Sequence, residues 1–146
     1  MSNIIEYSTP NGIIFQLDTF KGKRALVGDY SISSYFNTKM VLKSLGIEFD
    51  IEHTMYGMKE RILNGNKYDF ILTNNIYQNG TGIMLLDKLK KIPNFNTPVI
   101  VHTISDNINN QFLNMGFDGY LKKPIKQDET IDLLKTLLQT KKDETN

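Results

Sequence analysis

Five short apolar runs, each followed by a segment with apolar residues at helical spacing, constrain the fold of this chain more than any other feature of its sequence. The runs lie at residues 25–27, 47–51, 69–73, 99–103 and 120–121. After the first run, apolar residues recur at helical spacing from Ile32 to Leu45, and Gly46 ends the predicted helix. Because right-handed crossovers place each helix on the sheet, repeated strand and helix units with short connections predict a parallel sheet covered on both faces.

The second run indicates the order of the strands. Residues 47–51 alternate apolar side chains with Glu48 and Asp50, which is typical of a strand at a wetter sheet edge. The flavodoxin-like order 2-1-3-4-5 places the second strand at an edge. The predicted fold is therefore α/β, a doubly wound five-stranded parallel sheet in that order. After the fourth apolar run, Ser105 or Asp106 is expected to cap a fourth helix, which ends at Gly116.

An N-terminal extension precedes this domain. Two apolar runs at residues 4–8 and 13–17 are joined by Thr9-Pro10-Asn11-Gly12, a turn sequence that predicts a β-hairpin because Asn and Gly tolerate positive φ. We divide the chain into a hairpin and linker at 1–21, a main domain at 22–140, and a polar tail at 141–146 that is expected to fray.

Composition excludes several classes of function. With 146 residues and 40% hydrophobic residues, the chain can build one good core. Its 17 Lys and Arg residues nearly balance 16 Asp and Glu residues, so charge offers no argument for nucleic acid or an anionic membrane as a partner. No apolar run approaches the roughly 20 residues of a membrane span. The absence of cysteine excludes disulfides and thiolate metal sites and fits a cytoplasmic location.

Polar or small residues end several of the predicted strands. These strand-end residues are Gly28, Asp29, Asn74, Thr103 and Lys123. The carboxyl ends of parallel strands open onto a common crevice, where ligands bind in sheets of this kind. We therefore expect these five residues to surround one cleft.

The sequences around these positions resemble the receiver (response-regulator, CheY-like) domain of two-component systems. Tyr-Asp-Phe-Ile-Leu-Thr-Asn, which ends at Asn74 and is followed by Gly82, resembles the third receiver strand and its loop. Leu-Val-Gly-Asp, Pro-Val-Ile-Val-His-Thr and Gly-Phe-Asp-Gly-Tyr-Leu-Lys-Lys-Pro resemble three further receiver signatures. Their order and spacing match over roughly residues 23 to 140.

The resemblance implies a role for each cleft residue. Asn74 occupies the position of the aspartate that accepts a phosphoryl group, Asp29 that of one of two acids that hold Mg²⁺, and Gly28 that of the other acid. Lys123 corresponds to the cation that contacts phosphoryl oxygens, Thr103 to the switch hydroxyl, and Tyr120 to the switch aromatic residue.

Two of these positions depart from the family pattern. Because an amide is not a useful nucleophile, Asn74 predicts that the domain does not accept phosphate. Mg²⁺ prefers several anionic oxygens, so with Asp29 alone its binding is expected to be weak, and no other cofactor is expected. Restoring acids with Gly28→Asp and Asn74→Asp is predicted to bring back Mg²⁺ binding.

Simpler interpretations remain open at the same residues. Asp29 can pair with Lys123 in a leftover cleft, and Lys123 can donate to the Asn74 side-chain oxygen. Tyr120 can be an ordinary core residue. His53 and His102, which lie on different predicted strands, are expected to be packing residues and not metal ligands.

These observations predict a receiver-like module of phosphorelay signalling that binds proteins without being phosphorylated and is not itself an enzyme. The expected partner is a histidine kinase, another two-component protein, or a second copy. A second copy would bind through the face of helix 4, strand 5 and helix 5, roughly residues 106–140, or through the hairpin. The hairpin and linker also resemble the end of a histidine-kinase ATP-binding domain, so a hybrid kinase parent and a simple extension are both open.

Two other functions are compatible with the same residues. The cleft at Asp29, Thr103 and Lys123 could respond to a ligand other than a phosphoryl group. The same topology could bind FMN or another phosphate ligand through hydroxyls at Ser31, Ser33 and Ser34, since the N-terminus of a helix attracts anions. The loop lacks a phosphate-binding glycine and Asp29 would repel the anion, which counts against FMN.

Overall fold

The computed structural model of the chain describes residues 4–144, with side chains described up to residue 138. Five parallel strands form the central sheet in the order β4-β3-β5-β8-β9. In that order they are β4 (Glu48–Glu52), β3 (Arg24–Gly28), β5 (Phe70–Asn74), β8 (Val99–Thr103) and β9 (Gly119–Lys122). This arrangement confirms the predicted flavodoxin-like order 2-1-3-4-5.

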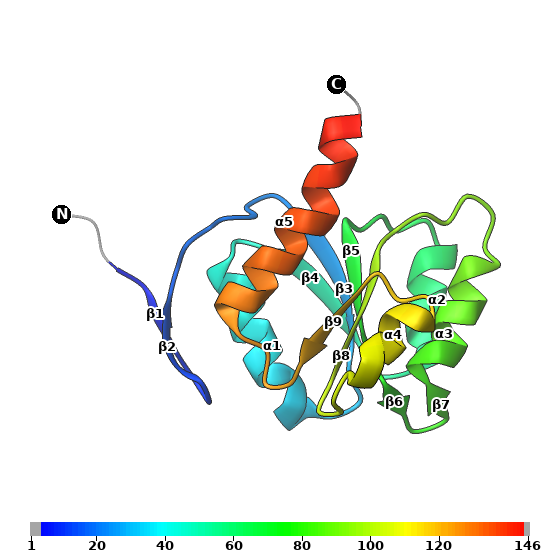
Figure 1. Cartoon of the computed structure of the whole chain (residues 1–146), viewed down its shortest axis with the longest axis horizontal. Helices are drawn as coiled ribbons and strands as arrows, with labels where there is room; N and C mark the ends of the chain where they lie inside the picture. The colour runs from blue at the N-terminus through cyan, green and yellow to red at the C-terminus, as the bar shows by residue number, and fades with distance from the viewer. Residues whose placement is uncertain (1–3, 145–146) are drawn as a thin grey trace.

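Helices cover both faces of the sheet (Figure 1). One face carries α1 (Ile32–Ser44) and α5 (Gln127–Glu144), and the other carries α2 (Met55–Leu63), α3 (Gly82–Lys90) and α4 (Gln111–Asn114). Each layer has its own apolar cluster, with Val41 and Leu134 in the first and Met58, Leu85 and Phe112 in the second. No helix within residues 4–144 is both long and apolar enough to cross a bilayer.

Burial along the strands follows their positions in the sheet. Every residue of β5 is buried, because this central strand has a neighbour on each side and helices on both faces. In β4 no residue is fully buried, and the side chains of Asp50 and Glu52 pair with Arg24 and Arg61 instead of core residues. The alternation at residues 47–51 therefore did indicate an edge strand.

The fourth helix is much shorter than predicted. A 3₁₀ turn at Ile108–Asn110 precedes α4, and both Asn109 and Asn110 have left-handed backbone conformations with φ of 54° and 57°. Two successive left-handed residues break the hydrogen-bond pattern of an α-helix, and asparagine adopts them more readily than most residues. Neither Ser105 nor Asp106 caps this helix, since the side-chain oxygen of Asn107 accepts the hydrogen bond from Phe112 N at 3.0 Å.

Two further elements differ from the sequence-based expectation. The glycine-containing loop after β5 forms a small hairpin from β6 (Ile76–Tyr77) and β7 (Gly80–Thr81). At the C-terminus, α5 continues to Glu144 and so passes the boundary expected at residue 140. Residues 145 and 146 lie outside the described part of the chain.

The N-terminal hairpin is present as predicted and consists of β1 (Glu6–Thr9) and β2 (Gly12–Phe15), which lie beside α1 (Figure 1). Asn11 Nδ2 donates to Pro124 O at 3.0 Å, and Gln127 Nε2 donates to Phe15 O at 2.9 Å. Phe20, in the predicted linker, is buried in the main core. Hairpin and linker are therefore packed on the domain.

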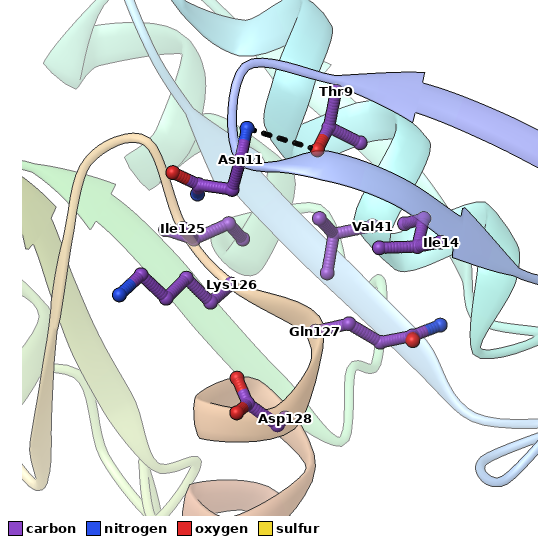
Figure 2. A pocket seen from close by; sticks show the side chains of 8 residues that line it. All are labelled: Thr9, Asn11, Ile14, Val41, Ile125, Lys126, Gln127 and Asp128. Atoms are coloured by element: carbon purple, nitrogen blue, oxygen red, sulfur yellow. Dashed lines mark hydrogen bonds between the residues drawn. The ribbon is translucent and has the colours of Figure 1, made fainter.

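A cavity of about 390 Å³ remains between the hairpin and the start of α5 (Figure 2). Its lining comes from the hairpin, from α1 and from the segment that leads into α5: Thr9, Asn11, Ile14, Val41, Ile125, Lys126, Gln127 and Asp128. The hairpin therefore contacts the domain at the edges of this cavity. Ile14 packs against the core cluster.

Deleting residues 1–15, which spares Phe20, should lower the melting temperature by roughly 2–8 °C, since the partly buried side chains Tyr7, Thr9 and Ile14 and a few hydrogen bonds correspond to about 1–2 kcal/mol in a domain of this size. Gln127→Ala, which removes the bonds to Phe15 and Ser44, should lower it less and in the same direction. Melting by circular dichroism and sedimentation velocity test this. Identical melting and sedimentation of the full and shortened chains would show that the hairpin contributes neither stability nor association.

Candidate functional site

The strand ends do converge. Asp29, Asn74, Thr103 and Lys123 line one cavity of about 260 Å³ at the carboxyl edge of the sheet. Gly28, the fifth expected residue, ends β3 and has no side chain to contribute. The structure therefore brings four of the five strand-end residues together, and Ser31, Ser34 and Ser105 add further polar groups to the lining.

Lys123 is held by three partners inside the cleft. Its Nζ donates to Asp29 Oδ2 at 2.7 Å, to Ser34 Oγ at 2.7 Å and to Asn74 Oδ1 at 3.2 Å. An ammonium group has three hydrogens to donate, so these contacts use all of them. The Lys123 side chain is 9% exposed and that of Asp29 is fully buried, which makes the ion pair an internal one.

Both oxygens of Asp29 are engaged. Oδ2 accepts from Lys123, and Oδ1 accepts from the backbone N of Ser31 at 3.1 Å. Ser31 is also the N-cap of α1, where its side chain accepts from Ser34 N. The carboxylate thus ties the start of α1 to the end of β9 and satisfies the interior charge of Lys123.

Asn74 is oriented by contacts at both ends of its amide. Oδ1 accepts from Lys123, and Nδ2 donates to Ile76 O at 2.8 Å. An aspartate could make the first contact but not the second, because an ionised carboxylate has no hydrogen to donate. Asparagine therefore fits this position by supplying an acceptor to the lysine and a donor to the next loop.

Thr103 and Tyr120 both contact the loop after β8. Thr103 Oγ1 accepts from Ser105 N at 3.2 Å, and the Tyr120 hydroxyl donates to Ser105 O at 2.8 Å. The Tyr120 ring stacks on Phe112 with centroids 5.3 Å apart. Tyr120 is therefore both packed against α4 and hydrogen-bonded to the loop that borders the cleft.

The sequence reasoning missed Tyr77. Its hydroxyl lies 2.8 Å from Thr73 Oγ1 and accepts from Asn74 N at 3.3 Å. Burial raises the pKa of Tyr77 to about 12, so the group is neutral. The signal that could have found it is Asn79-Gly80, which is typical of a hairpin turn and would turn Tyr77 back toward the sheet.

His102 lies inside the protein beneath the cleft. It is fully buried, its Nε2 is 3.2 Å from Gly28 O, and its Nδ1 has no hydrogen-bond partner among the described residues. Burial, reinforced by the positive charge of Lys123 and opposed by Asp29, lowers the pKa of His102 to about 4. Its ring is therefore neutral at physiological pH. The exposed His53 contacts Asp29 O through Nδ1 at 2.7 Å.

The donor set of the cleft does not fit Mg²⁺. Hard divalent ions need several free oxygens, yet both Asp29 oxygens and the Asn74 side-chain oxygen already accept hydrogen bonds. Within the described residues no three His, Cys, Asp or Glu side chains are grouped as a metal site would require. A cation would also face the Lys123 ammonium. The residues of this cleft therefore do not supply the ligands that a bound Mg²⁺ ion would need.

A doubly wound parallel sheet whose strand-end side chains meet in one cleft defines a flavodoxin-like α/β domain. A family model described as the response regulator receiver domain matches residues 32–135, more than half of the chain. The chain belongs to the response regulator receiver domain family. It is thus a receiver domain of the two-component type, as the strand-end motifs predict.

Similar proteins agree with this family. The Francisella response regulator 1452 receiver domain is 30% identical with a TM-score of 0.69, over 82% of this chain and 99% of that chain. A two-component response regulator from Clostridium difficile is 28% identical with a TM-score of 0.67, over 80% of this chain and 96% of that one. "Probable transcriptional regulator ycf29" of Porphyra purpurea is 32% identical over 94 residues, 62% of this chain. The match spans 45% of the length of that relative.

Proposed function

We propose that this receiver domain signals by binding proteins and not by accepting phosphate. The observation that carries the proposal is the position of Lys123, whose ammonium is bound to Asp29, Ser34 and the Asn74 amide inside the cleft. The cation that a phosphoryl group would need is already neutralised by a buried carboxylate. The cleft is internally satisfied without a ligand.

The chemistry of Asn74 supports the same conclusion. Transfer to this position would need a nucleophilic oxygen, and the amide oxygen is a poor nucleophile that already accepts from Lys123. Asp69 cannot replace it. That residue precedes β5, at the opposite end of the strand from Asn74, and binds Arg24 N there.

Incubation with acetyl phosphate and Mg²⁺, or with beryllofluoride, should leave the intact mass and the amide NMR spectrum unchanged. Asn74→Asp is the matched variant, because it restores the nucleophile while it loses only the hydrogen bond from Nδ2 to Ile76 O and gains a negative charge. An aspartyl phosphate mapped to any residue of the wild-type cleft would contradict the proposal. So would beryllofluoride-induced shifts at Thr103 and Lys123.

Partners of such a module belong to two-component signalling, with a histidine kinase or another regulator as the proposed class. Three exposed apolar side chains stand around the cleft, Tyr30 at 52%, Ile76 at 57% and Ile104 at 78% exposure. This rim supports a role in protein binding. The proposed face at roughly residues 106–140 contains only a short α4, so a dimer there would rest mainly on β9 and α5.

The hairpin remains the other proposed surface for a second copy. Its outward side chains Ile13, Phe15 and Leu17 are exposed, while Ile14 faces the domain. A hybrid kinase as the parent protein also stays a proposal, supported only by the hairpin and the linker that follows it.

Of the ligand-binding alternatives, the cleft volume favours a small non-phosphoryl ligand over FMN. Ser34 accepts from Lys123, Ser31 caps α1, and Ser33 lies 3.1 Å from the Ser31 hydroxyl, so these serines are engaged locally. A yellow purified protein would support flavin, whereas we expect a colourless one.

A further inference from the structure

We infer that Tyr77 is a steric plug beside Gly28, because its hydroxyl occupies the space that the Cβ atom of an acidic side chain at position 28 would need and so withholds a second carboxylate from a metal ion in the cleft. This inference rests on the proposed function of the same cleft. The steric contact between position 28 and Tyr77 can nevertheless be tested independently of phosphate acceptance.

The geometry at Gly28 carries the inference. A Cβ atom built on Gly28 would lie 2.0 Å from the Tyr77 hydroxyl oxygen and 2.8 Å from Met58 Cε. Both neighbours are buried, Tyr77 at 3% and Met58 at 0% exposure. The first distance is far below any contact between unbonded atoms, so even alanine at position 28 requires Tyr77 to move.

Tyr77 is held in place from two sides. Its hydroxyl is bonded to Thr73 and to the backbone N of Asn74, both at the end of β5. Its backbone belongs to β6, which pairs with β7 directly before α3. Movement of the ring would therefore break two buried polar contacts and disturb the connection between β5 and α3.

The Tyr77 hydroxyl also makes polar contacts beside position 28. Its oxygen satisfies polar groups at Thr73 and Asn74 without bringing a negative charge next to Asp29. Glycine at 28 and tyrosine at 77 thus form a complementary pair, separated by 49 positions in sequence. The inference opposes the prediction that Gly28→Asp with Asn74→Asp would restore Mg²⁺ binding, because an acid at position 28 would collide with the Tyr77 hydroxyl.

A double-mutant cycle tests the steric claim without any metal. Gly28→Ala should lower the melting temperature by roughly 4–10 °C, the range for overpacking a core of this size. In a Tyr77→Leu background the same change should cost less than half as much, since the flexible Met58 end can adjust. Tyr56→Leu, at an exposed tyrosine on α2, is the control background. Equal losses from Gly28→Ala in all three backgrounds would overturn the plug.

Magnesium titrations test the consequence. Gly28→Asp with Asn74→Asp should show no Mg²⁺-dependent rise in melting temperature while Tyr77 remains. Adding Tyr77→Leu should produce a rise of roughly 5–10 °C at one hundred times the dissociation constant, reversed by chelator. A Mg²⁺-dependent rise in melting temperature while Tyr77 is present would contradict the inference. So would the absence of such a rise in a triple variant that melts cooperatively. If the triple variant does not fold, the alanine cycle decides. Phosphate acceptance by the wild type would contradict the proposed function and leave the cycle unaffected.

Discussion

Lys123→Met is expected to lower the free energy of unfolding by roughly 3–5 kcal/mol, because it leaves the Asp29 carboxylate buried without its counter-ion. Asp29 has no exposed surface and Lys123 is 9% exposed, so solvent cannot replace the lost charge. Urea denaturation of both proteins at neutral pH measures the loss.

The matched control is Lys122→Met, one residue earlier. Lys122 pairs with Asp106 on the surface, so its removal should change stability little. Asp29→Asn combined with Lys123→Met should recover most of the stability, since no unpaired charge remains. A Lys123→Met protein as stable as the Lys122→Met protein would show that the internal ion pair does not hold the cleft together.

The second large effect concerns pH. His102 has a pKa of about 4 in the folded protein, below the ordinary histidine value of 6.5. Between these values the unfolded chain binds the proton and the folded protein does not, so the contribution of His102 is fully present above about pH 6.5 and declines as pH falls toward 4. The total loss is roughly 3 kcal/mol.

Urea denaturation between pH 7 and pH 5 measures the contribution of His102 in a range above the ordinary pKa values of carboxylates. Wild-type stability should fall over that range, and His102→Leu should flatten the fall whatever its stability at pH 7. His53→Leu, at the exposed histidine, is the control and should keep the wild-type slope. If the free energy of unfolding of His102→Leu falls with pH as steeply as that of the wild type, other groups cause the pH dependence.

Several parts of the molecule could be predicted from local sequence. Buried runs such as residues 69–73 and the alternating run at 47–51 indicated central and edge positions, because burial on one or both faces determines the side-chain pattern. The turn sequence Thr9-Pro10-Asn11-Gly12 marked the first hairpin. Asp29, Asn74, Thr103 and Lys123 could be placed in one cleft because parallel strands all end at the same edge.

The interruption of helix 4 was not predictable in this way. Ser105 and Asp106 are good capping residues, but the Asp106 carboxylate pairs with Lys122 and the backbone oxygen of Ser105 accepts from the Tyr120 hydroxyl, which fixes the course of this loop. These partners lie on β9, fifteen or sixteen residues further along the chain. A local capping preference gave way to contacts that exist only once the strands are assembled.

The amino-acid sequence by itself determined that Asp29, Asn74, Thr103 and Lys123 lie at one edge of the sheet. Only the tertiary structure decided what these residues do to one another: that Lys123 is already saturated by Asp29, Ser34 and Asn74, and that Tyr77 fills the space beside Gly28. The physical reason is distance along the chain. Repeating patterns report burial over a few residues, whereas the contact between Gly28 and Tyr77 joins the end of β3 to the β6–β7 hairpin, and only the packing of the folded chain brings these two segments together.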